Sequence, residues 1–435
     1  MNASVIGAGL SGCEAAWQLA QRGIDVTLYE QKPQKHSPAH HADTFAELVC
    51  SNSLRSDLPA SGPGLLKAEL RQMDSLILTS ADATHVEAGG ALAVDREAFS
   101  ALVTERIRRH PRITVVEEEC TEIPDGQVII ATGPLTEGVM ADRIRELCGE
   151  PLSFYDASAP LVTFDSIDMD SAFFAARYDK GTPDYINCPM TEEEYNIFWE
   201  ALSSAEAAPV HGFEETMVFE GCMPVEVMAH RGKMTLAFGP LKPVGLIDPR
   251  TGKMPFAVVQ LRRDNSAGTL YNLVGFQTHL KHPEQKRVFS LIPALKKAEF
   301  ARYGVMHRNS FLNSPALLDA RYALRKDPRV RFAGQMTGVE GYIESTASGL
   351  VAGISTAFVL HGLPEPEFPK TTAIGSLGHY VAEGPETGDF QPMNINFGIM
   401  EPLPRHFRKR DRKQMQYERA MRELQTVIQN CKITL

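Results

Sequence analysis

The N-terminus carries the feature that most constrains the fold, a glycine-rich turn between an apolar strand and a small-residue helix. The turn Gly7-Ala8-Gly9-Leu10-Ser11-Gly12 has the spacing GxGxxG. It follows a strand expected at Ser4–Ile6 and precedes a helix expected from about Cys13 to Arg22. In this setting the first glycine makes the tight turn, the second admits a pyrophosphate, and the third lets the helix pack on the strand. The pattern predicts a Rossmann-like nucleotide-binding unit.

A second strand, expected at Asp25–Glu30, ends on a carboxylate. Glu30 lies eighteen residues after Gly12, where such units place an acid that accepts hydrogen bonds from an adenosine ribose. The alternative is a glycine-rich surface turn followed by an unrelated surface glutamate. The strand–turn–helix context favours the nucleotide site.

Two later strand ends favour FAD over a nicotinamide coenzyme as the resident nucleotide. The run Ile129-Ile130-Ala131-Thr132-Gly133 is similar to the ATG strand end of two-dinucleotide flavoproteins. The run Phe332-Ala333-Gly334-Gln335 is similar to the strand that reaches the flavin ribityl chain, with Gln335 where many relatives carry Asp. We therefore expect Thr132, Gly133, Gly334 and Gln335 beside the cofactor.

Four further glycines follow this last strand, at positions 338, 341, 349 and 353. They leave room for a cofactor at the start of a small-residue helix expected near Ser345–Val359. Close helix packing is the alternative explanation, and it accounts best for Gly349 and Gly353.

The chain divides into four parts by pattern. Strands expected at Ile113–Glu117, Gln127–Gly133 and Val330–Gly334 belong with the N-terminal unit, whereas residues 155–300 contain short mixed segments between turn clusters. We expect a first part of the FAD-binding domain at 1–154, an inserted substrate domain at 155–300, a return segment at 301–400 and a basic tail helix at 401–435. The fold class is α/β, a Rossmann-like FAD-binding fold of the two-dinucleotide type with an α+β insertion.

Composition narrows the classes of function. A net charge of −10 has the wrong sign for a protein that coats nucleic acid without selectivity, so any contact with RNA needs a local basic patch. The seven scattered cysteines include no CxxC pair, which suits free thiols and predicts no metal site. No signal peptide and no run of eighteen apolar residues is apparent, so a cytoplasmic protein without a membrane span is expected.

Two of the cysteines differ from the others in their surroundings. Cys50 stands at the junction between an apolar stretch and the polar run 51–56, where backbone N–H groups and a nearby Arg could favour the thiolate. Cys222 lies between Gly221 and Met223-Pro224, a turn able to present one side chain to a cleft. For any single cysteine a small buried apolar role is the commoner explanation.

Several unusual sequence segments of this chain resemble segments of a known protein family. They are Phe45-Ala46-Glu47-Leu48-Val49-Cys50-Ser51-Asn52-Ser53-Leu54-Arg55-Ser56, residues 89–96 (GGALAVDR), residues 187–194 (NCPMTEEE), residues 220–224 (EGCMP), residues 239–246 (GPLKPVGL), residues 303–309 (YGVMHRN) and residues 338–342 (GVEGY). With the N-terminal turn they closely resemble the bacterial folate- and FAD-dependent tRNA (uracil-5-)methyltransferases, from residue 4 to about residue 400.

The resemblance implies methylation of the T-loop uridine of tRNA. Methylenetetrahydrofolate would supply the carbon, reduced FAD the hydride, and NAD(P)H the electrons. The carbon would pass from folate to the flavin N5 and then to uracil. The partners implied are tRNA, folate and NAD(P)H, with no obligate protein partner evident.

The family's two functional cysteines fall on Cys50 and Cys222. Uracil C5 is a poor nucleophile, and addition of a thiolate at C6 converts the ring to an enolate that can attack a one-carbon electrophile. We expect Cys222 to add to uracil and Cys50 to lie beside the flavin, although the two roles could be exchanged.

Other polar groups are weaker candidates. His40, His41, His307 and Arg308 could contact folate carboxylates or phosphates, or could be ordinary polar residues. The basic run Arg405–Lys413 could hold tRNA phosphates, or could be a solvated helix face.

Three other functions remain open from sequence alone. The related flavin- and folate-dependent tRNA wobble-uridine modification protein shares the fingerprint but is longer and needs a partner subunit. A generic flavin reductase or oxidase would leave the two cysteines unexplained. The third alternative is an RNA-binding scaffold that retains FAD but catalyses no reaction.

Overall fold

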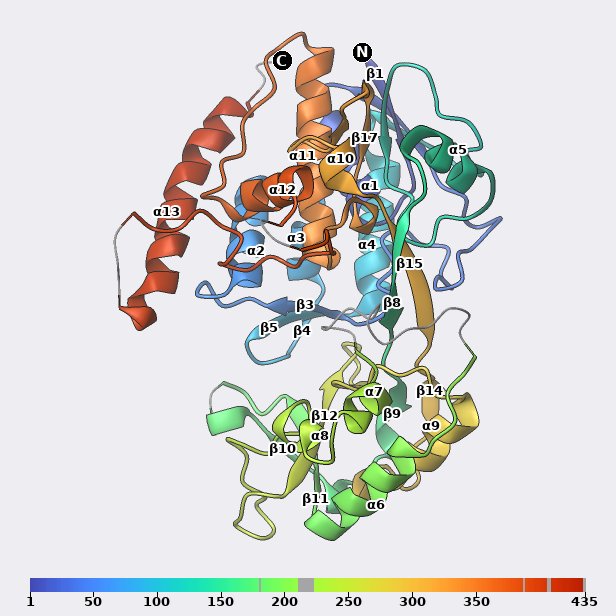
Figure 1. The fold of residues 1–435 in the computed structure, drawn as a ribbon, viewed down its shortest axis with the longest axis vertical. Helices are drawn as coiled ribbons and strands as arrows, with labels where there is room; N and C mark the ends of the chain where they lie inside the picture. The colour runs from blue at the N-terminus through green and yellow to red at the C-terminus, as the bar shows by residue number, and fades with distance from the viewer. Residues whose placement is uncertain (180, 210–222, 386–387, 405–407, 433–435) are drawn as a thin grey trace.

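The structure is a computed structural model that describes residues 1–435 except 180, 210–222, 386–387, 405–407 and 433–435. Figure 1 shows two lobes, one above the other. The upper lobe holds both termini, and the lower lobe is formed by the middle of the chain. Each lobe has its own large hydrophobic core, one drawn from residues 3–144 and 312–431 and the other from residues 159–298.

The upper lobe is built on a six-stranded sheet of order β16-β17-β7-β1-β2-β6. Its strands are β1 (Asn2–Ile6), β2 (Asp25–Tyr29), β6 (Ile113–Val116), β7 (Gln127–Ile130), β16 (Ala323–Leu324) and β17 (Asp327–Phe332). All neighbours pair in parallel except β16 with β17. A parallel sheet is covered on both faces, which agrees with the burial of consecutive residues at Val128–Ile130 and Val330–Phe332 in its inner strands.

The observed elements lie close to the expected ones but differ at their ends. Helix α1 (Leu10–Ala20) begins three residues before the expected start, because Gly9 is its N-cap and the glycine turn leads directly into the helix. Strand β7 ends at Ile130 instead of Gly133, and β17 ends at Phe332 instead of Gly334. In both cases the last expected residues have left the sheet to line the cavity described below.

Helix α11 (Tyr342–Leu360) crosses α1 at very close range. A Cβ on Gly349 would lie 2.2 Å from the Ser11 carbonyl oxygen, and one on Gly353 would lie 2.7 Å from that of Ala15. This confirms close helix packing as the explanation for these two glycines. The helix is long and apolar enough to cross a membrane, but 83 % of its apolar window is buried inside the protein, as in a core helix.

The lower lobe contains a second six-stranded sheet, antiparallel throughout, of order β10-β11-β12-β13-β9-β14. Its elements are β9 (Leu161–Thr163), β10 (Phe173–Ala175), β11 (Tyr185–Met190), β12 (Ala257–Arg263), β13 (Leu270–Leu273), β14 (Phe300–Arg302), α6 (Glu192–Ser203), α7 (Val225–His230), α8 (Thr235–Phe238) and α9 (His282–Phe289). Helix α6 starts with a complete capping box, in which Thr191 and Glu194 exchange side-chain-to-backbone hydrogen bonds.

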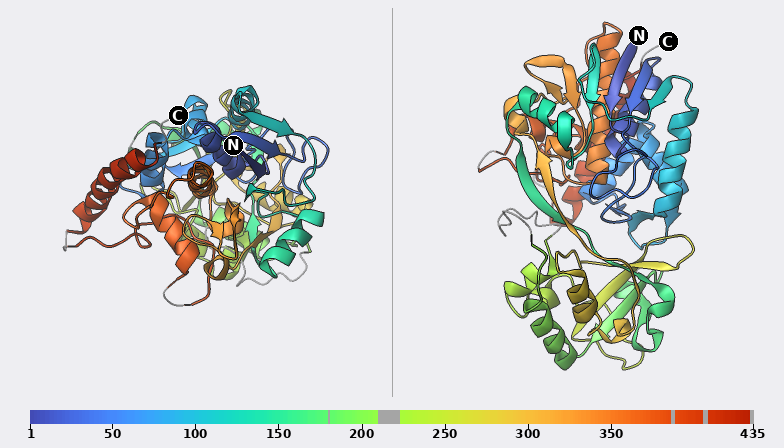
Figure 2. Two further views of the ribbon diagram at one scale, coloured as in Figure 1. Left: turned by 90° about the horizontal axis from the view of Figure 1, so that it is seen from above. Right: turned by 90° about the vertical axis from the view of Figure 1, so that its right-hand side faces the viewer.

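An antiparallel ribbon joins the lobes, as the side view in Figure 2 makes clear. It consists of β8 (Leu152–Ala157), where the chain leaves the upper lobe, and β15 (Met306–Phe311), where it returns. A small sheet of order β3-β5-β4 faces the lower lobe: β3 (Ser53–Ser56), β4 (His85–Val86) and β5 (Ala91–Val94).

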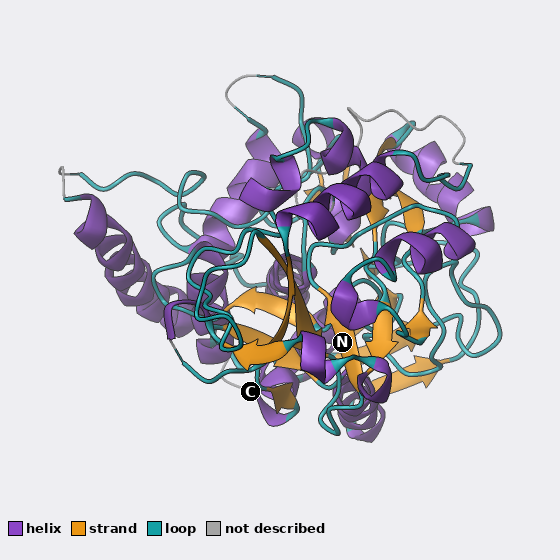
Figure 3. Ribbon diagram, turned by 90° about the horizontal axis from the view of Figure 1, so that it is seen from below, coloured by secondary structure: helices purple, strands orange, loops and turns teal. Residues whose placement is uncertain are grey.

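The remaining helices surround the upper sheet and are α2 (Gly62–Gln72), α3 (Leu76–Ala83), α4 (Arg96–Arg109), α5 (Gly138–Cys148), α10 (Ser314–Leu317), α12 (Ala373–Glu383) and α13 (Lys409–Asn430). The last of these lies at the edge of the molecule, as Figure 3 shows from below.

Candidate active site

The glycine turn forms one end of a cavity between the lobes. Gly7 has φ +98°, and a Cβ there would lie 2.6 Å from the Ala131 carbonyl oxygen. A Cβ on Gly12 would lie 1.8 Å from the Gly7 carbonyl oxygen, so this glycine allows α1 to approach the strand. A Cβ on Gly9, in contrast, would meet nothing within 4 Å. The open space at Gly9 and the uncapped N-terminus of α1 fit a pyrophosphate.

Glu30 is held in place by the same turn. The Ala8 N–H donates to Glu30 Oε2 at 2.7 Å, and the Lys32 N–H donates to Oε1 at 3.0 Å. The carboxylate is buried and lines the cavity, and each oxygen keeps a further acceptor position. This arrangement suits the two hydroxyl groups of an adenosine ribose.

Segments far apart in sequence meet at this cavity. Of the residues expected at the site, those that line it are Gly7, Gly9, Leu10, Ser11, Glu30, Cys50, Thr132, Gly133, Gly334 and Gln335. Ala8 and Gly12 do not line it, because one positions Glu30 and the other packs between backbone segments. A Cβ on Gly338 would meet the Phe390 ring at 2.4 Å, so the expectation of cofactor space at this glycine is wrong.

These residues fit FAD. A dinucleotide needs a phosphate turn, an acid for its adenosine ribose, and backbone that approaches closely along its length. Gly133 is open, with φ +82° and no atom within 4 Å of its added Cβ, and Gly334 has φ +85°. The Gly334 N–H donates to Ser348 Oγ at 2.7 Å, which fixes the turn after β17.

Cys50 lines the same cavity and lies against Tyr342. The Cys50 Sγ is 3.0 Å from the Tyr342 hydroxyl oxygen, and the Cys50 N–H donates to the same oxygen at 2.9 Å. Burial raises the pKa of the Cys50 thiol to about 11, and the negative charge of Asp156 adds to this shift. The Tyr342 hydrogen bond and Arg96 oppose it without reversing it. The expectation that the surroundings of Cys50 favour the thiolate is therefore wrong for this state of the protein.

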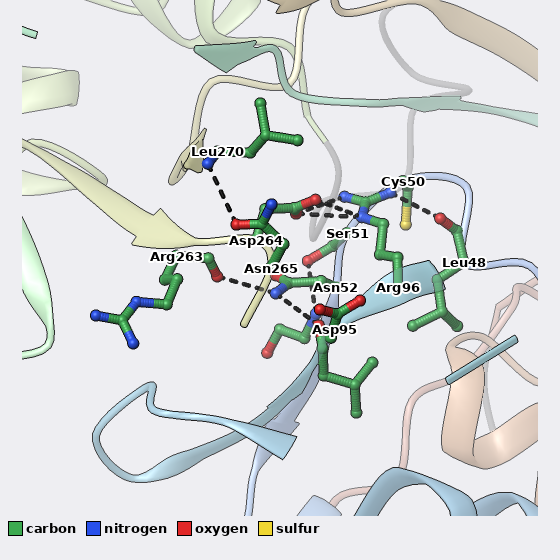
Figure 4. Close-up of polar contacts among 12 residues, drawn as sticks. Leu48, Cys50, Ser51, Asn52, Asp95, Arg96, Arg263, Asp264, Asn265 and Leu270 are labelled. Atoms are coloured by element: carbon green, nitrogen blue, oxygen red, sulfur yellow. Dashed lines mark hydrogen bonds and ion pairs between the residues drawn. The ribbon is translucent and has the colours of Figure 1, made fainter. Parts of the chain in front are cut away.

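The segment that carries Cys50 is bound to the lower lobe by polar contacts (Figure 4). Arg96 donates to the Leu48 carbonyl oxygen at 2.7 Å and forms a buried ion pair with Asp264, with Nε 3.0 Å from Oδ2. The adjacent Asn52 side chain donates to the Arg263 carbonyl oxygen at 2.9 Å. The loop before β3 is thus anchored to the end of β12.

Arg262 completes this junction. Its Nε donates to Asn52 Oδ1 at 3.1 Å, and its Nη2 donates to Ser51 Oγ at 2.6 Å. Asp95, the N-cap of α4, accepts from the Ser266 N–H and hydroxyl at 2.9 and 2.6 Å. Sequence reasoning assigned no role to any of these groups, because the partners are more than 160 residues apart along the chain.

The candidate histidines gather at the cavity as well. His40, His41 and His307 all line it, whereas Arg308 does not and donates through Nε to Ser153 Oγ at 3.0 Å. Burial lowers the pKa of His307, and the nearby His41 lowers it further. A neutral imidazole is therefore favoured at His307 near neutral pH.

Two expected features lie partly or wholly outside the described residues. Cys222 belongs to the undescribed segment 210–222, and the basic run Arg405–Lys413 is described only in part. Within the ranges that the structure does describe, no group of three or more His, Cys, Asp or Glu side chains is arranged to hold a metal ion.

Comparison with known proteins agrees with this geometry. The chain matches the family described as glucose inhibited division protein A over residues 2–364. The methylenetetrahydrofolate–tRNA-(uracil-5-)-methyltransferase TrmFO of Acetivibrio thermocellus is 62 % identical, with 97 % of this chain and 96 % of the relative covered. The protein of the same name from Bacillus subtilis is 58 % identical, with 98 % of each chain covered.

A solved structure shares the fold. GidA of Aquifex aeolicus superposes with a TM-score of 0.72 at 14 % identity, covering 99 % of this chain and 73 % of that one. This likeness supports the FAD-binding α/β fold expected from the glycine turn and the later strand ends. The chain belongs to the glucose inhibited division protein A family and, within it, to the methylenetetrahydrofolate–tRNA-(uracil-5-)-methyltransferases.

Proposed function

We propose that this protein methylates C5 of the T-loop uridine of tRNA in the cytoplasm. Methylenetetrahydrofolate is the carbon donor, FAD is the resident cofactor, and NAD(P)H supplies the electrons. The observation that supports this most directly is one cavity that is lined both by the N-terminal glycine turn and by Cys50. The identity of 62 % to a named methyltransferase across nearly the whole chain supports the same reaction.

Gly9, Glu30, Gly133 and Gly334 are proposed to hold the cofactor. When bound, FAD supplies the hydride that reduces a one-carbon unit to a methyl group. The chain's own residues bind the cofactor through backbone N–H groups and a carboxylate, and the cavity walls shield the reacting atoms from water.

Cys222 is proposed as the thiol that adds to uracil C6. The sulfur–C6 bond forms while the C5=C6 electron pair moves toward the C4 carbonyl oxygen, which makes C5 nucleophilic. Cys50 is not assigned this role, because its pKa of about 11 favours the protonated thiol near neutral pH. We assign Cys50 to the position beside the flavin, where Tyr342 orients its sulfur.

The lower lobe is proposed as the tRNA-binding part. The division into residues 1–154, 155–300, 301–400 and 401–435 assigns it to the second of these segments. The basic run Arg405–Lys413, which continues into the start of α13, is proposed as an additional phosphate contact, because the chain as a whole is acidic.

The test combines product analysis with covalent trapping. Protein, tRNA, methylenetetrahydrofolate and NADPH should yield methyluridine in the T-loop by mass spectrometry. A wobble adduct, NADPH consumption without a tRNA product, or no reaction would each favour one of the competing functions.

Trapping with 5-fluorouridine tRNA separates the two cysteines, because fluorine blocks loss of the C5 substituent after attack. We expect a covalent complex from wild-type protein and from Cys50→Ala, but none from Cys222→Ala. Cys148→Ala serves as a control, since this half-buried thiol at the end of α5 does not line the cavity. A complex that survives in Cys222→Ala and vanishes in Cys50→Ala would exchange the two roles.

A further inference from the structure

Arg302 is a partly buried cation in the cavity with unused hydrogen-bond donors. It is the last residue of β14 and lines the cavity from the lower lobe. Its Nε and Nη2 atoms are buried and have no hydrogen-bond partner among the described residues. An arginine normally uses its planar fork of donors when it leaves water, because unpaired buried donors and charges are costly.

The surroundings of Arg302 do not compensate its charge. Asp264 attracts it, but that carboxylate is already engaged by Arg96, which repels Arg302. Burial lowers the pKa of Arg302, and Arg96 lowers it further. Arg262, on β12, is more deeply buried than Arg302 and donates to two side chains. The contrast indicates that the donors of Arg302 are kept for a ligand.

The position of Arg302 limits the ligand. It lies close enough to Cys50 and Tyr342 to interact with them electrostatically, and the three residues line the same part of the cavity. A planar guanidinium fork pairs best with an oxygen acceptor that carries negative charge. On the proposed function, two pyrimidine rings reach this part of the cavity, that of the flavin and that of the target uracil, and each gains charge on a carbonyl oxygen during the reaction.

We propose that Arg302 donates to the carbonyl oxygen of a pyrimidine ring in this part of the cavity and stabilises the negative charge that develops there. The inference rests on the proposed function, and flavin and uracil are the two sources of this acceptor. For uracil, the thiolate forms a bond to C6, the C5=C6 electron pair forms a C4=C5 double bond, and the C4=O4 electron pair moves onto O4. Arg302 neutralises the resulting enolate oxygen.

The test uses Arg302→Gln, Arg302→Lys and a control, Arg287→Gln, whose parent side chain is exposed on α9 and paired with Glu284. Two quantities are measured on FAD-loaded protein: the flavin midpoint potential without RNA, and the rate of adduct formation with saturating 5-fluorouridine tRNA. Arg302→Gln should lower the potential if the flavin is the acceptor. It should slow the adduct by about 100-fold if uracil is the acceptor, as for loss of one oxyanion donor.

Arg302→Lys keeps the positive charge but lacks the planar set of donors. Whichever of the two measured quantities changes, it should change less in Arg302→Lys than in Arg302→Gln. If neither quantity moves in either variant, the proposal is overturned. It is also overturned if only the half-saturating tRNA concentration rises, since that result identifies a phosphate contact. A wild-type protein that makes no methyluridine and no adduct would refute the proposed function, and an unchanged potential in Arg302→Gln would then refute this inference separately.

Discussion

Two parts of the cavity are built on opposite principles. In the part around the glycine turn, three glycines, the N-terminus of α1 and one carboxylate come from a continuous stretch of thirty residues. In the other part, Cys50, Tyr342 and Arg302 come from three distant segments and both lobes. The first part uses backbone groups that exist in any chain, and the second uses side chains that burial has perturbed.

The difference corresponds to two tasks, binding the phosphates of a cofactor and providing side chains that can react. Backbone N–H groups at a helix start attract phosphate without any change in protonation. In the second part, burial raises the pKa of Cys50 to about 11 and that of Tyr342 well above its usual range. Glu340, hydrogen-bonded to Gln335, also has a pKa raised well above its usual value by burial and by Asp156. Perturbed groups of this kind cluster where reactions occur.

The largest expected effect is loss of the cofactor from Gly9→Val. Because a Cβ at Gly9 meets no protein atom within 4 Å, the variant should fold normally, while its side chain occupies the space of the pyrophosphate. We expect the purified variant to contain essentially no flavin, so that its flavin absorbance is lost. Stoichiometric flavin in Gly9→Val would show that the phosphate turn is misplaced.

The next effect concerns the buried ion pair that anchors the Cys50 loop. Arg96→Met leaves Asp264 buried without its partner, which should lower the free energy of unfolding by about 3–5 kcal/mol. Arg287→Met, which breaks an exposed pair, should cost about 1 kcal/mol or less. Urea denaturation measures both. Equal effects would mean that the junction contributes no more than a surface contact.

A smaller effect is expected in the reactivity of Cys50. With a pKa of about 11, its alkylation by iodoacetamide at pH 7.5 should be about 100-fold slower than that of an ordinary thiol of pKa about 8.5. The rate should rise about tenfold per pH unit up to about pH 9.5 without a plateau. Tyr342→Phe removes a hydrogen bond that lowers this pKa and should slow the reaction further. A plateau near pH 8 would mean that burial does not control this thiol.

The smallest effect concerns the tail. Replacing Arg408, Lys409 and Arg410 by Gln should weaken tRNA binding and reduce the slope of log K against log salt by about 0.9 for each duplex phosphate that the variant no longer neutralises. Flavin content should not change, because the tail lies at the edge of the molecule. An unchanged slope would place the phosphate-binding residues on the lower lobe alone.

The contrast between local backbone groups and distant side chains also explains which parts of the site could be predicted from the sequence. Gly7, Gly9 and Glu30 belong to one local strand–turn–helix–strand unit, so their spacing was sufficient to predict that they line one cavity. Their role in binding the cofactor stays a prediction. Arg302 carries no local signal, since its significance lies in what surrounds it after β14 has packed against β9. Cys50 was found from its position in a family-like string, but its protonation state depends on burial against Tyr342, which spacing does not reveal.

The parallel pairing of β7 with β17 has a consequence for how the chain acquires its cofactor. Val128 pairs with Val330, about two hundred residues later, across the whole inserted lobe. Contacts of such long range form slowly, because closing the intervening chain costs entropy before the pairing stabilises it. During synthesis β17 cannot join the central sheet until residue 332 has emerged. The glycine turn therefore forms before Gly334 and Gln335 are in place, and the cofactor site is incomplete until then. The antiparallel pairing of β8 with β15 brings the two ends of the insertion together and reduces that delay.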